Sequence, residues 1–443
     1  MKTARFRILV AVIALCLLLT SCMQQVEPQP PETQPTTAPT TELATEPRSD
    51  PKIRKLHVAY METDLASLQI VESFVSEDIE LVPVILSEEA FDNYLLYTEN
   101  PADIILIPHT TEVNTAAYAL QKRVYKLDEI IPKILEKTEY YPILDAGKID
   151  GFQYFLPLRF QLPYLLTTKS NLDIFALSSF ERSDMKTRMM QIQDLIENKE
   201  AGKGLILTPI ESDIGAALYY ALRLSGVWKS DPASPGAPIT EELLYEYGQY
   251  IYALWKETKY TQKQQQRTHA AYPYPLISSE KFPLVLGEGC LPDVFRVFDS
   301  RNSNHPILLG HPQYSTANSL TADITLYAAI QTSGDNVAHI QEFLHHAFTT
   351  PEGQGMQEGL SACRAAVATY MDRLANQPAQ VFADGPCYQT VQNLSKSVRG
   401  ACEAILNQIT SGSIRNAYWT DFFPIKWTVF CWVKKAIRNV CSP

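Results

Sequence analysis

The chain has 443 residues, of which 46% are hydrophobic, and it carries a formal net charge of −11. A hydrophobic content of this size is typical of a globular protein with a substantial core. An acidic chain lacks the basic surface that general nucleic-acid binding needs, so we expect no nucleic-acid partner.

The N-terminus has the pattern of a secretory signal. Lys2, Arg5 and Arg7 precede an apolar run over residues 8–19, which is shorter than the ~20 apolar residues of a membrane-spanning helix and fits a signal peptide. The run ends in LTSC (residues 19–22), which resembles the bacterial lipobox, a motif whose cysteine receives diacylglycerol before cleavage. We expect a signal peptide over residues 1–21 and lipid attachment at Cys22. An ordinary signal peptide is the alternative.

Residues 22–51 predict a tether behind this anchor. They are rich in Pro, Thr, Glu and Gln, and such a segment buries too little apolar surface to fold and acts as a disordered spacer. Together, anchor and tether predict a protein held at the cell membrane by its lipid and facing the outside of the cytoplasm.

Residues 52–108 predict the start of a doubly wound α/β fold. Strand-like runs occur at KIRKLHVAYM (52–61), ELVPVIL (80–86) and ADIILIP (102–108). Helical spacing of apolar residues separates them, first from Leu65 onward and then around Phe91. The third run is apolar almost throughout, as expected of a parallel strand that is buried on both faces.

The remaining chain alternates in the same way. Further strands are predicted in AGKIDGFQYFLPLRFQLPYLL (146–166), GLILTP (204–209), FPLVLG (282–287) and ADITLYAAIQTS (322–333), and helices over 113–121, 185–196, 213–226, 241–258 and 337–348. No segment after the signal looks like a membrane-spanning helix.

The order of these segments resembles the extracellular solute-binding proteins of ABC importers, in particular the group typified by maltose-binding protein. Four stretches carry the resemblance: ADIILIP, residues 146–172, ITLYAAIQTSGDNVAHIQEFLHHAFTTPEGQ (324–354) and YQTVQNLSKSVRGACEAILNQITSG (388–412). The resemblance implies a periplasmic-binding-protein-like (type II) α/β fold with two discontinuous lobes and a hinge. Lobe 1 would hold residues 52–160 and 312–358, and lobe 2 residues 161–311 and 359–443.

The same resemblance implies a function without catalysis. A monomer would capture a small polar solute, with carbohydrate as one candidate, and deliver it to ABC permease subunits. We expect no metal and no cofactor. The alternative is a lipoprotein that keeps the fold for sensing or for envelope assembly. Residues 167–169 and 287–293 depart from the pattern of the sugar binders, which leaves the identity of the solute open.

Ligands of open α/β sheets bind at the carboxyl ends of the strands, so the candidate binding residues come from the loops after the predicted strands, from the first crossing between the implied lobes (Arg159 and Phe160) and from the rim of the cleft (Tyr314). They are Glu62, His109, Arg159, Phe160, Glu211, Ser212, Glu288 and Tyr314. Other roles remain open for some of them, since Glu211 and Ser212 can cap a helix, Phe160 can be core, and Arg159 can pair with a surface carboxylate.

Two features of the C-terminal half stay open. The cysteines Cys290, Cys363, Cys387, Cys402, Cys431 and Cys441 can form disulfides or remain buried thiols in an exported protein. The aromatic and basic residues 418–437 can pack on lobe 2 or lie in a membrane interface, and packing is the interpretation that we prefer.

Overall fold

The computed structural model describes residues 53–99, 101–109, 123–166, 285–301, 320–331, 337–355, 358–378, 380–384 and 387–414. The signal, the tether, the helix predicted over residues 113–121, the elements predicted between residues 171 and 281, and the aromatic tail lie outside these ranges. The chain divides into Met1–Asp50 and Pro51–Pro443, and every described residue belongs to the second unit.

The first five elements form the predicted doubly wound start. They are β1 (Arg54–Met61), α2 (Leu65–Glu72), β2 (Ile79–Leu86), α3 (Glu88–Tyr97) and β3 (Ile104–Pro108). Strand β1 pairs in parallel with both β2 and β3. All residues of β3 are buried, which agrees with its continuous apolar sequence.

The later elements complete the sheet and cover it. They are α5 (Ile131–Ile134), η1 (Leu144–Gly147), β4 (Lys148–Ile149), β5 (Phe152–Gln153), β6 (Leu156–Leu166), β7 (Val285–Gly289), α12 (Leu291–Arg301), β8 (Leu320–Ile330), α13 (Val337–Thr349), β9 (Leu360–Ser361), α14 (Arg364–Asn376), β10 (Gln380–Asp384), β11 (Cys387–Val391), α15 (Lys396–Leu406) and β12 (Ile409–Ile414).

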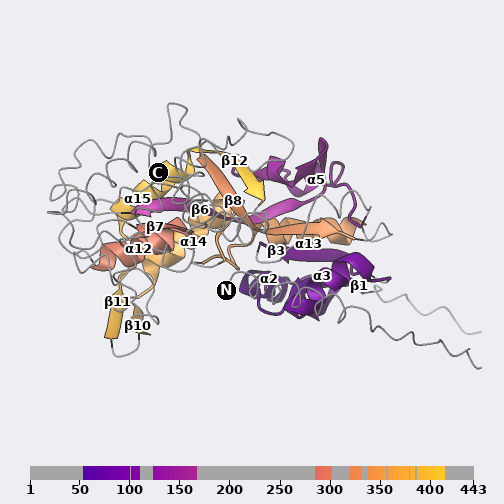
Figure 1. Ribbon diagram of the computed structural model, residues 1–443, viewed down its shortest axis with the longest axis horizontal. Helices are drawn as coiled ribbons and strands as arrows, with labels where there is room; N and C mark the ends of the chain where they lie inside the picture. The colour runs from indigo at the N-terminus through magenta and orange to yellow at the C-terminus, as the bar shows by residue number, and fades with distance from the viewer. Residues whose placement is uncertain are drawn as a thin grey trace, which may run out of the picture. The chain divides into compact units, whose positions relative to one another are not determined.

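The described strands of the main sheet follow the order β2-β1-β3-β8-β6-β7, with β12 added to β8 and β9 to β6. Strand β8 therefore lies between an N-terminal strand, β3, and the strand β6, although it comes much later in the sequence (Figure 1). Both pairings are antiparallel. A mixed α/β fold of this kind confirms the predicted fold class.

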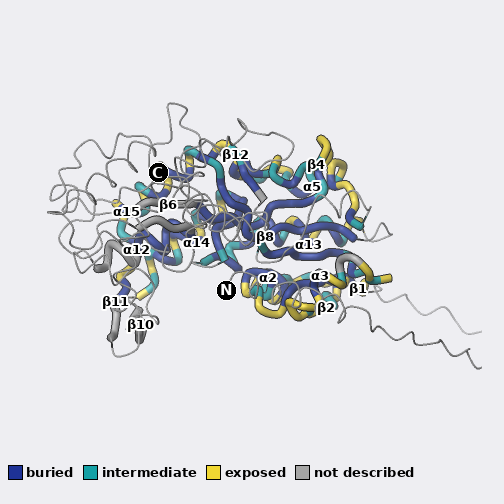
Figure 2. Tube along the Cα trace, in the orientation of Figure 1, coloured by how far each residue is buried: buried dark blue, intermediate teal, exposed yellow. Residues whose placement is uncertain are grey.

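The core lies along β8 and its neighbours, where the chain is buried almost throughout (Figure 2). The rings of Phe155 and Tyr327 meet edge to face at 5.3 Å, and those of Phe74 and Phe343 at 5.4 Å. The second contact joins the segment after α2 to α13. Edge-to-face pairs of this kind add to the stability that area burial alone supplies.

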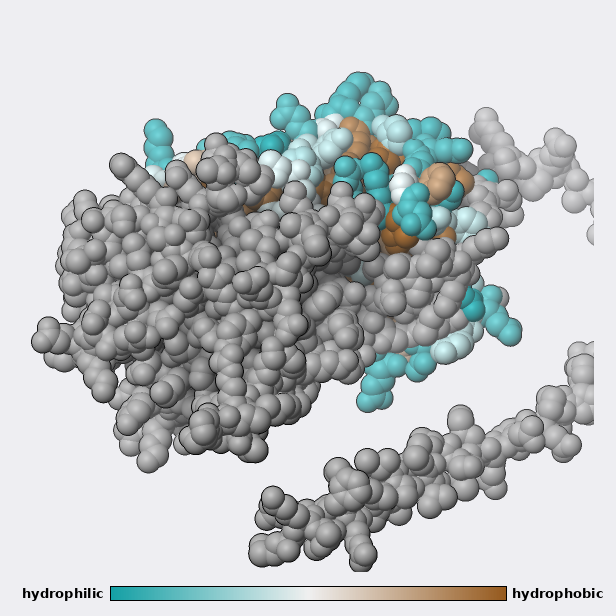
Figure 3. Space-filling view, turned by 45° about the horizontal axis from the view of Figure 1, so that its top comes forward, coloured by the Kyte–Doolittle hydropathy of each residue, from teal (hydrophilic) through white to brown (hydrophobic). Residues whose placement is uncertain are grey.

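The described surface is mixed in character. In the described part of the face drawn in Figure 3, hydrophilic side chains surround smaller apolar areas, and some exposed apolar surface is normal for a folded domain. None of the described helices has the length and apolar character needed to span a bilayer.

Three of the six C-terminal cysteines have described side chains. Cys290, Cys363 and Cys402 are buried free thiols. For these three cysteines the structure supports buried thiols rather than disulfides. Cys431 and Cys441 lie outside the described residues.

Candidate functional site

A cavity of about 360 Å³ lies at the carboxyl ends of β1 and β3. Its size falls within the range of small-molecule sites, about 300–1,000 Å³. The lining residues come from the ends of these strands, the starts of α2 and α3, the middle of β8 and the segment before β9. They are Met61, Thr63, Asp64, Leu65, Ala66, Glu88, Pro108, His109, Thr325, Leu326 and Glu358.

The start of α2 contributes a carboxylate to the cavity. Asp64 is the N-cap of this helix, and it accepts hydrogen bonds from the backbone N–H of Ser67 at 3.2 Å and from the Ser67 hydroxyl. Burial raises the pKa of the Asp64 carboxyl, and the neighbouring charge of Glu358 raises it further. The helix terminus is thus satisfied by its own side chain, as is typical of an N-cap.

The start of α3 adds a second acidic group. Ser87 caps the helix by accepting from the N–H of Ala90 at 3.3 Å, and Glu88 in the first turn lines the cavity. A carboxylate at this place complements the positive end of the helix dipole. The described lining therefore combines three carboxyl groups with apolar side chains.

His109 reaches the cavity because β3 ends beside β8. Its backbone N–H donates to the carbonyl of Thr325 at 2.8 Å, and its Nδ1 lies 3.3 Å from the same oxygen. The structure places this predicted site residue in the cavity lining. Glu62, also predicted, is exposed between two lining residues, and its N–H donates to Leu86 O at 2.9 Å.

The register of β8 explains why the cavity forms at this place. Strand β3 covers residues 326–330 of β8, ending with Pro108 opposite Leu326. On the stretch before this, β12 runs parallel to β8 and ends with Ile414 opposite Ile324. Strands β3 and β12 thus run in opposite directions, and their carboxyl ends meet at Thr325, one on each side of it along β8. Crevices outside carboxyl ends of strands are where open α/β sheets bind ligands.

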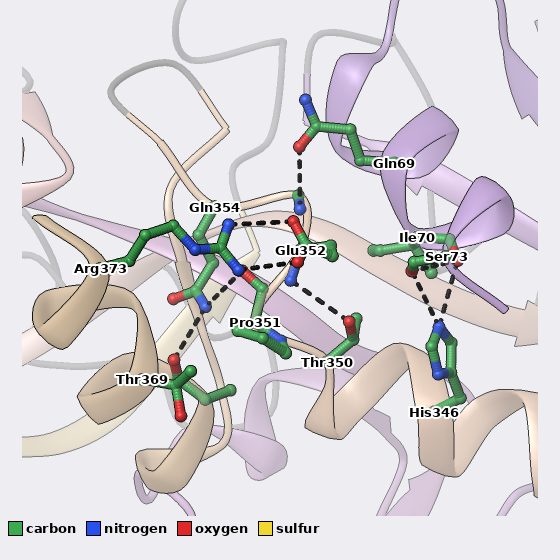
Figure 4. Close-up of polar contacts among 12 residues, drawn as sticks. Gln69, Ile70, Ser73, His346, Thr350, Pro351, Glu352, Gln354, Thr369 and Arg373 are labelled. Atoms are coloured by element: carbon green, nitrogen blue, oxygen red, sulfur yellow. Dashed lines mark hydrogen bonds and ion pairs between the residues drawn. The ribbon is translucent and has the colours of Figure 1, made fainter. Parts of the chain in front are cut away.

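Residues 350–355 and 358–359, which we call the strap, close one side of the cavity. The N–H of Gly353 donates to Oε1 of Gln69 on α2 at 3.0 Å (Figure 4). Gly355 and Gly359 exchange backbone hydrogen bonds at 3.1 and 2.9 Å. The hydroxyl of Thr325 donates to the carbonyl of Glu358 at 2.9 Å. The strap therefore carries Glu358 to the cavity and attaches it to both α2 and β8.

An ion pair and a histidine fix the segments around the strap. Arg373 on α14 donates to Glu352 at 2.7 and 3.0 Å, and His346 on α13 points its Nε2 toward the hydroxyl of Ser73 (Figure 4). The hydrogen bonds from Arg373, and then its charge, lower the pKa of Glu352. These contacts hold α13 and α14 against the elements that carry the cavity.

Arg159, a predicted ligand residue, is fully buried behind the strap. Its guanidinium donates to the carbonyls of Gly353 at 2.8 Å and of Glu352 at 2.5 Å, and further contacts go to Leu158, Ala347, Thr350 and Ser361. Burial lowers its pKa to about 9. These bonds give Arg159 a structural role and leave no exposed surface for a solute. Arg159 thus does not form the ion pair with a surface carboxylate that was the alternative prediction.

Phe160 is also fully buried, and its ring meets that of Tyr141 edge to face at 5.3 Å. Its position is that of a core residue, which was the alternative interpretation of its sequence. Glu288 lies in β7 opposite Pro163, where only the backbone is described. Glu211, Ser212 and Tyr314 lie outside the described residues, so their predicted roles stay predictions.

Sequence reasoning missed several lining residues. Asp64 has a recognisable signal, since an aspartate directly before an amphipathic helix is a typical N-cap. Thr325 has a weaker one, because polar residues alternate with apolar ones in LTADIT (320–325). Glu358 has no local signal, since its place depends on contacts of the strap with α2 and β8.

The comparisons with known proteins show the fold. No family model matches the chain, and no match was found among curated proteins. An extracellular solute-binding protein family 1 structure from Alicyclobacillus acidocaldarius is 13% identical, covers 81% of this chain and 87% of its own, and has a TM-score of 0.53. The galacto-N-biose-/lacto-N-biose I-binding protein of an ABC transporter from Bifidobacterium longum is 9% identical over 84% and 89%, with a TM-score of 0.52.

Many of the similar structures are ABC solute receptors, and most are binding proteins rather than enzymes. A de novo designed cysteine esterase is similar as well, at 11% identity over 89% of this chain and 95% of its own, with a TM-score of 0.58. Identities this low support a shared fold alone. The fold of this chain is therefore that of the two-lobed, periplasmic-binding-protein-like solute receptors.

The described cysteines do not favour esterase chemistry. Burial raises the pKa values of Cys290 and Cys402, and Cys363 is buried. A cysteine nucleophile needs an accessible thiolate. Among the described residues, no group of three His, Cys, Asp or Glu side chains could hold a metal ion.

Proposed function

We propose that this protein is a lipid-anchored extracellular solute-binding protein that captures a small polar solute for an ABC importer. One observation carries the proposal: a cavity of about 360 Å³ lies where the carboxyl ends of β1 and β3 meet β8, in the fold of two-lobed solute receptors. In such folds, closure of the lobes around the solute supplies a two-state element that a membrane partner can recognise.

The lining supports a solute rich in hydrogen-bond donors. Asp64, Glu88 and Glu358 supply carboxyl oxygens, Thr63 and Thr325 supply hydroxyls, and the remaining lining residues are mostly apolar. Ionised carboxylates only accept hydrogen bonds. Hydroxyl groups of a carbohydrate satisfy them well, and the binding of galacto-N-biose or lacto-N-biose by a receptor of similar fold agrees with this class of ligand.

A thermal-shift screen followed by calorimetry tests the proposal. The probes are D-galactose, maltose, lacto-N-biose, amino acids and polyamines, added to the chain from residue 23 onward. A solute at a hundredfold excess over its dissociation constant stabilises the domain by ~2.7 kcal/mol. Stabilisation by one class supports solute capture, whereas no stabilisation by any class contradicts it.

Two variants connect binding to the cavity. Asp64→Asn keeps an N-cap of equal quality and removes the charge, and we expect affinity to fall by about tenfold or more, as for a lost charged hydrogen bond. Asp372→Asn is the matched control, because Asp372 is an exposed carboxylate that pairs with Arg399 on the surface. Equal affinity in both variants would place the solute elsewhere.

A second candidate function uses the same fold and cavity for sensing or envelope assembly. The two functions differ in the partner, since an importer needs ABC permease subunits and a sensor does not. Uptake of the radiolabelled solute by cells that carry or lack the gene separates them. Uptake that is independent of the gene, together with solute binding, favours sensing.

The anchor is proposed from the sequence. Cys22 would carry the lipid and hold a monomer at the outer face of the cell membrane through the tether of residues 22–51. Metabolic labelling with palmitate tests this: Cys22→Ser should abolish the labelling and leave the signal uncleaved at this site. Equal labelling of the variant and the parent would contradict lipid attachment at Cys22.

A further inference from the structure

A polar stripe runs along one face of β8, directly beside the cavity. Residues at i and i+2 in a strand share a face, so Thr321 and Asp323 lie on the same side, and Thr325 follows them at the bulge of β8 against β6. Asp323 and Thr325 are buried, and Thr325 lines the cavity. The stripe therefore begins at the cavity and continues away from β3, toward the part of β8 that pairs with β12.

The neighbouring strands extend this stripe sideways. Ser413 of β12 and Gln161 of β6 both pair with Asp323, and directly paired residues share a face. The hydroxyls of Thr321 and Ser411, one step along, lie 2.9 Å apart, which confirms the common face. Gln161, Asp323 and Ser413 thus form a polar row across three adjacent strands, and each is at most 5% exposed.

The opposite face of the same strands is apolar core. Ala322 and Ile324 are fully buried there, and Gly412 lies so close to Ile143 that an added Cβ would be 2.8 Å from the Ile143 carbonyl oxygen. A strand that is covered on both faces is normally apolar on both. The polar row on the other face of β8 therefore departs from this usual composition.

A separate observation concerns hydrogen bonding. The hydroxyl of Ser413 is buried and has no hydrogen-bond partner among the described residues. A buried polar group without a protein partner calls for a water molecule, an ion or a ligand. Because Ser413 pairs with Asp323, its hydroxyl lies on the same face as the Asp323 side chain, next to the part of β8 that lines the cavity.

We infer that Gln161, Asp323 and Ser413 form a polar subsite that extends the solute-binding cavity along β8. This inference rests on the proposed function for the identity of its solute. The stretch from Thr321 to Thr325 spans about 13 Å at ordinary strand rise. A carboxylate, an amide and a hydroxyl in one row suit an elongated solute with several donor and acceptor groups, with one part in the cavity and the other on the row.

Cysteine accessibility tests the subsite without any solute. Ser413→Cys is nearly isosteric, and Ala322→Cys is the matched control, because Ala322 lies on the neighbouring strand with its side chain on the apolar face. The probe is 2-aminoethyl methanethiosulfonate, and mass spectrometry of the peptide that contains each new cysteine reads the rate. We expect Ser413→Cys to react at least about tenfold faster, because the reagent enters a polar subsite and reaches a thiol that lines it, whereas packed apolar core excludes the reagent. Equal rates would show a packed face and overturn the inference, whether or not the solute screen finds a ligand.

A second pair of variants ties the row to binding. With the strongest binder among D-galactose, maltose and lacto-N-biose as the probe, Asp323→Asn should lower affinity about tenfold, and the probe should slow the labelling of Ser413→Cys. Gln331→Leu is the control, because Gln331 is buried and directly follows β8 at the end of the strand away from the row. An Asp323→Asn variant of normal affinity, or labelling unaffected by a bound probe, would overturn the subsite and leave solute capture standing.

Discussion

Arg159 shows how a single buried charge organises the surroundings of the cavity. Its guanidinium satisfies carbonyls of α13 and the strap that no helix or strand bond satisfies. Arg159→Met keeps the length of the side chain and removes every donor, which leaves these carbonyls buried without partners. Each such group costs about 1–3 kcal/mol, so we expect the free energy of unfolding to fall by about 3 kcal/mol.

Urea denaturation of the domain measures this change. The control is Arg364→Met, since Arg364 is only half-buried, with a hydrogen bond to Asn407 at 2.8 Å and its guanidinium over the ring of Tyr141, and partly exposed contacts of this kind contribute about 0.5–1 kcal/mol. Equal transition midpoints for the two variants would show that the bonds of Arg159 contribute little.

His346 makes stability depend on pH. Its Nε2 lies 3.0 Å from the Ser73 hydroxyl and 3.3 Å from the Ile70 carbonyl. Burial lowers its pKa, and the nearby positive charges of Arg159 and His345 act in the same direction. The folded chain thus keeps the ring neutral while the unfolded chain binds a proton near pH 6.5. The stabilisation is complete above about pH 6.5 and is lost as the pH falls from there toward the lowered folded pKa.

Unfolding free energies at pH 7.5 and pH 5 test this dependence. His346→Gln removes the titrating ring, so the variant should lose less stability between the two pH values than the parent does. His57→Gln, a change at a partly exposed histidine, is the comparison. An unchanged pH dependence in His346→Gln would assign the acid sensitivity to other groups.

The strap shows how one glycine fixes an element. Gly353 has a φ of +65°, and an added Cβ would lie 2.6 Å from the carbonyl oxygen of Ala66 in the cavity lining. Gly353→Ala therefore strains the backbone and pushes the strap away from α2. We expect a loss of about 2 kcal/mol in the free energy of unfolding, with weaker solute binding because Glu358 moves with the strap.

Gly400 provides a control of opposite sign. It lies inside α15, and an added Cβ would meet nothing within 4 Å, so Gly400→Ala should stabilise the domain by about 0.5–1 kcal/mol. Thermal unfolding of both variants measures the difference. Stabilisation by Gly353→Ala would show that the strap does not press on α2.

Elements with local signals were predictable from the sequence. The alternation in KLHVAYM and the apolar run IILIP predict β1 and β3, and the spacing of Leu65, Leu68 and Val71 predicts α2. Helices α12 and α14 were not predicted, although the buried residues Val367, Tyr370 and Leu374 of α14 recur at helical spacing. Strand β12 was missed because its sequence, ITSGSI, has neither strong β-propensity nor an apolar face.

The candidate site was predictable where it follows strands and unpredictable where distant segments meet. His109 directly follows a buried strand, so the carboxyl-end rule places it in the cavity. The partners of Arg159 lie almost 200 residues later in the chain, and no local pattern reveals them. The polar row depends on the register of β6, β8 and β12. No pattern within one strand shows which residues of its neighbours lie opposite it.

At the scale of the whole molecule, the order of the sheet decides what can fold alone. Strand β8 lies between β3 and β6, and the bonds of Arg159 also reach across to α13 and the strap. A fragment of residues 51–311 contains β3 and β6 but lacks every one of these partners. Removing a central strand leaves two unpaired edges in an otherwise buried sheet. Two domains of continuous sequence would not have this dependence.

We therefore expect the 51–311 fragment to show no cooperative thermal transition, whereas the 51–443 chain unfolds in one. Addition of a second fragment, residues 312–443, should restore the transition, because it returns β8 together with α13, the strap and β12. Circular dichroism during heating and hydrogen exchange at the amides of β3 measure both effects. Protected β3 amides and a cooperative transition in the 51–311 fragment alone would contradict the predicted discontinuous lobes, since the first lobe would then be complete without the chain after residue 311.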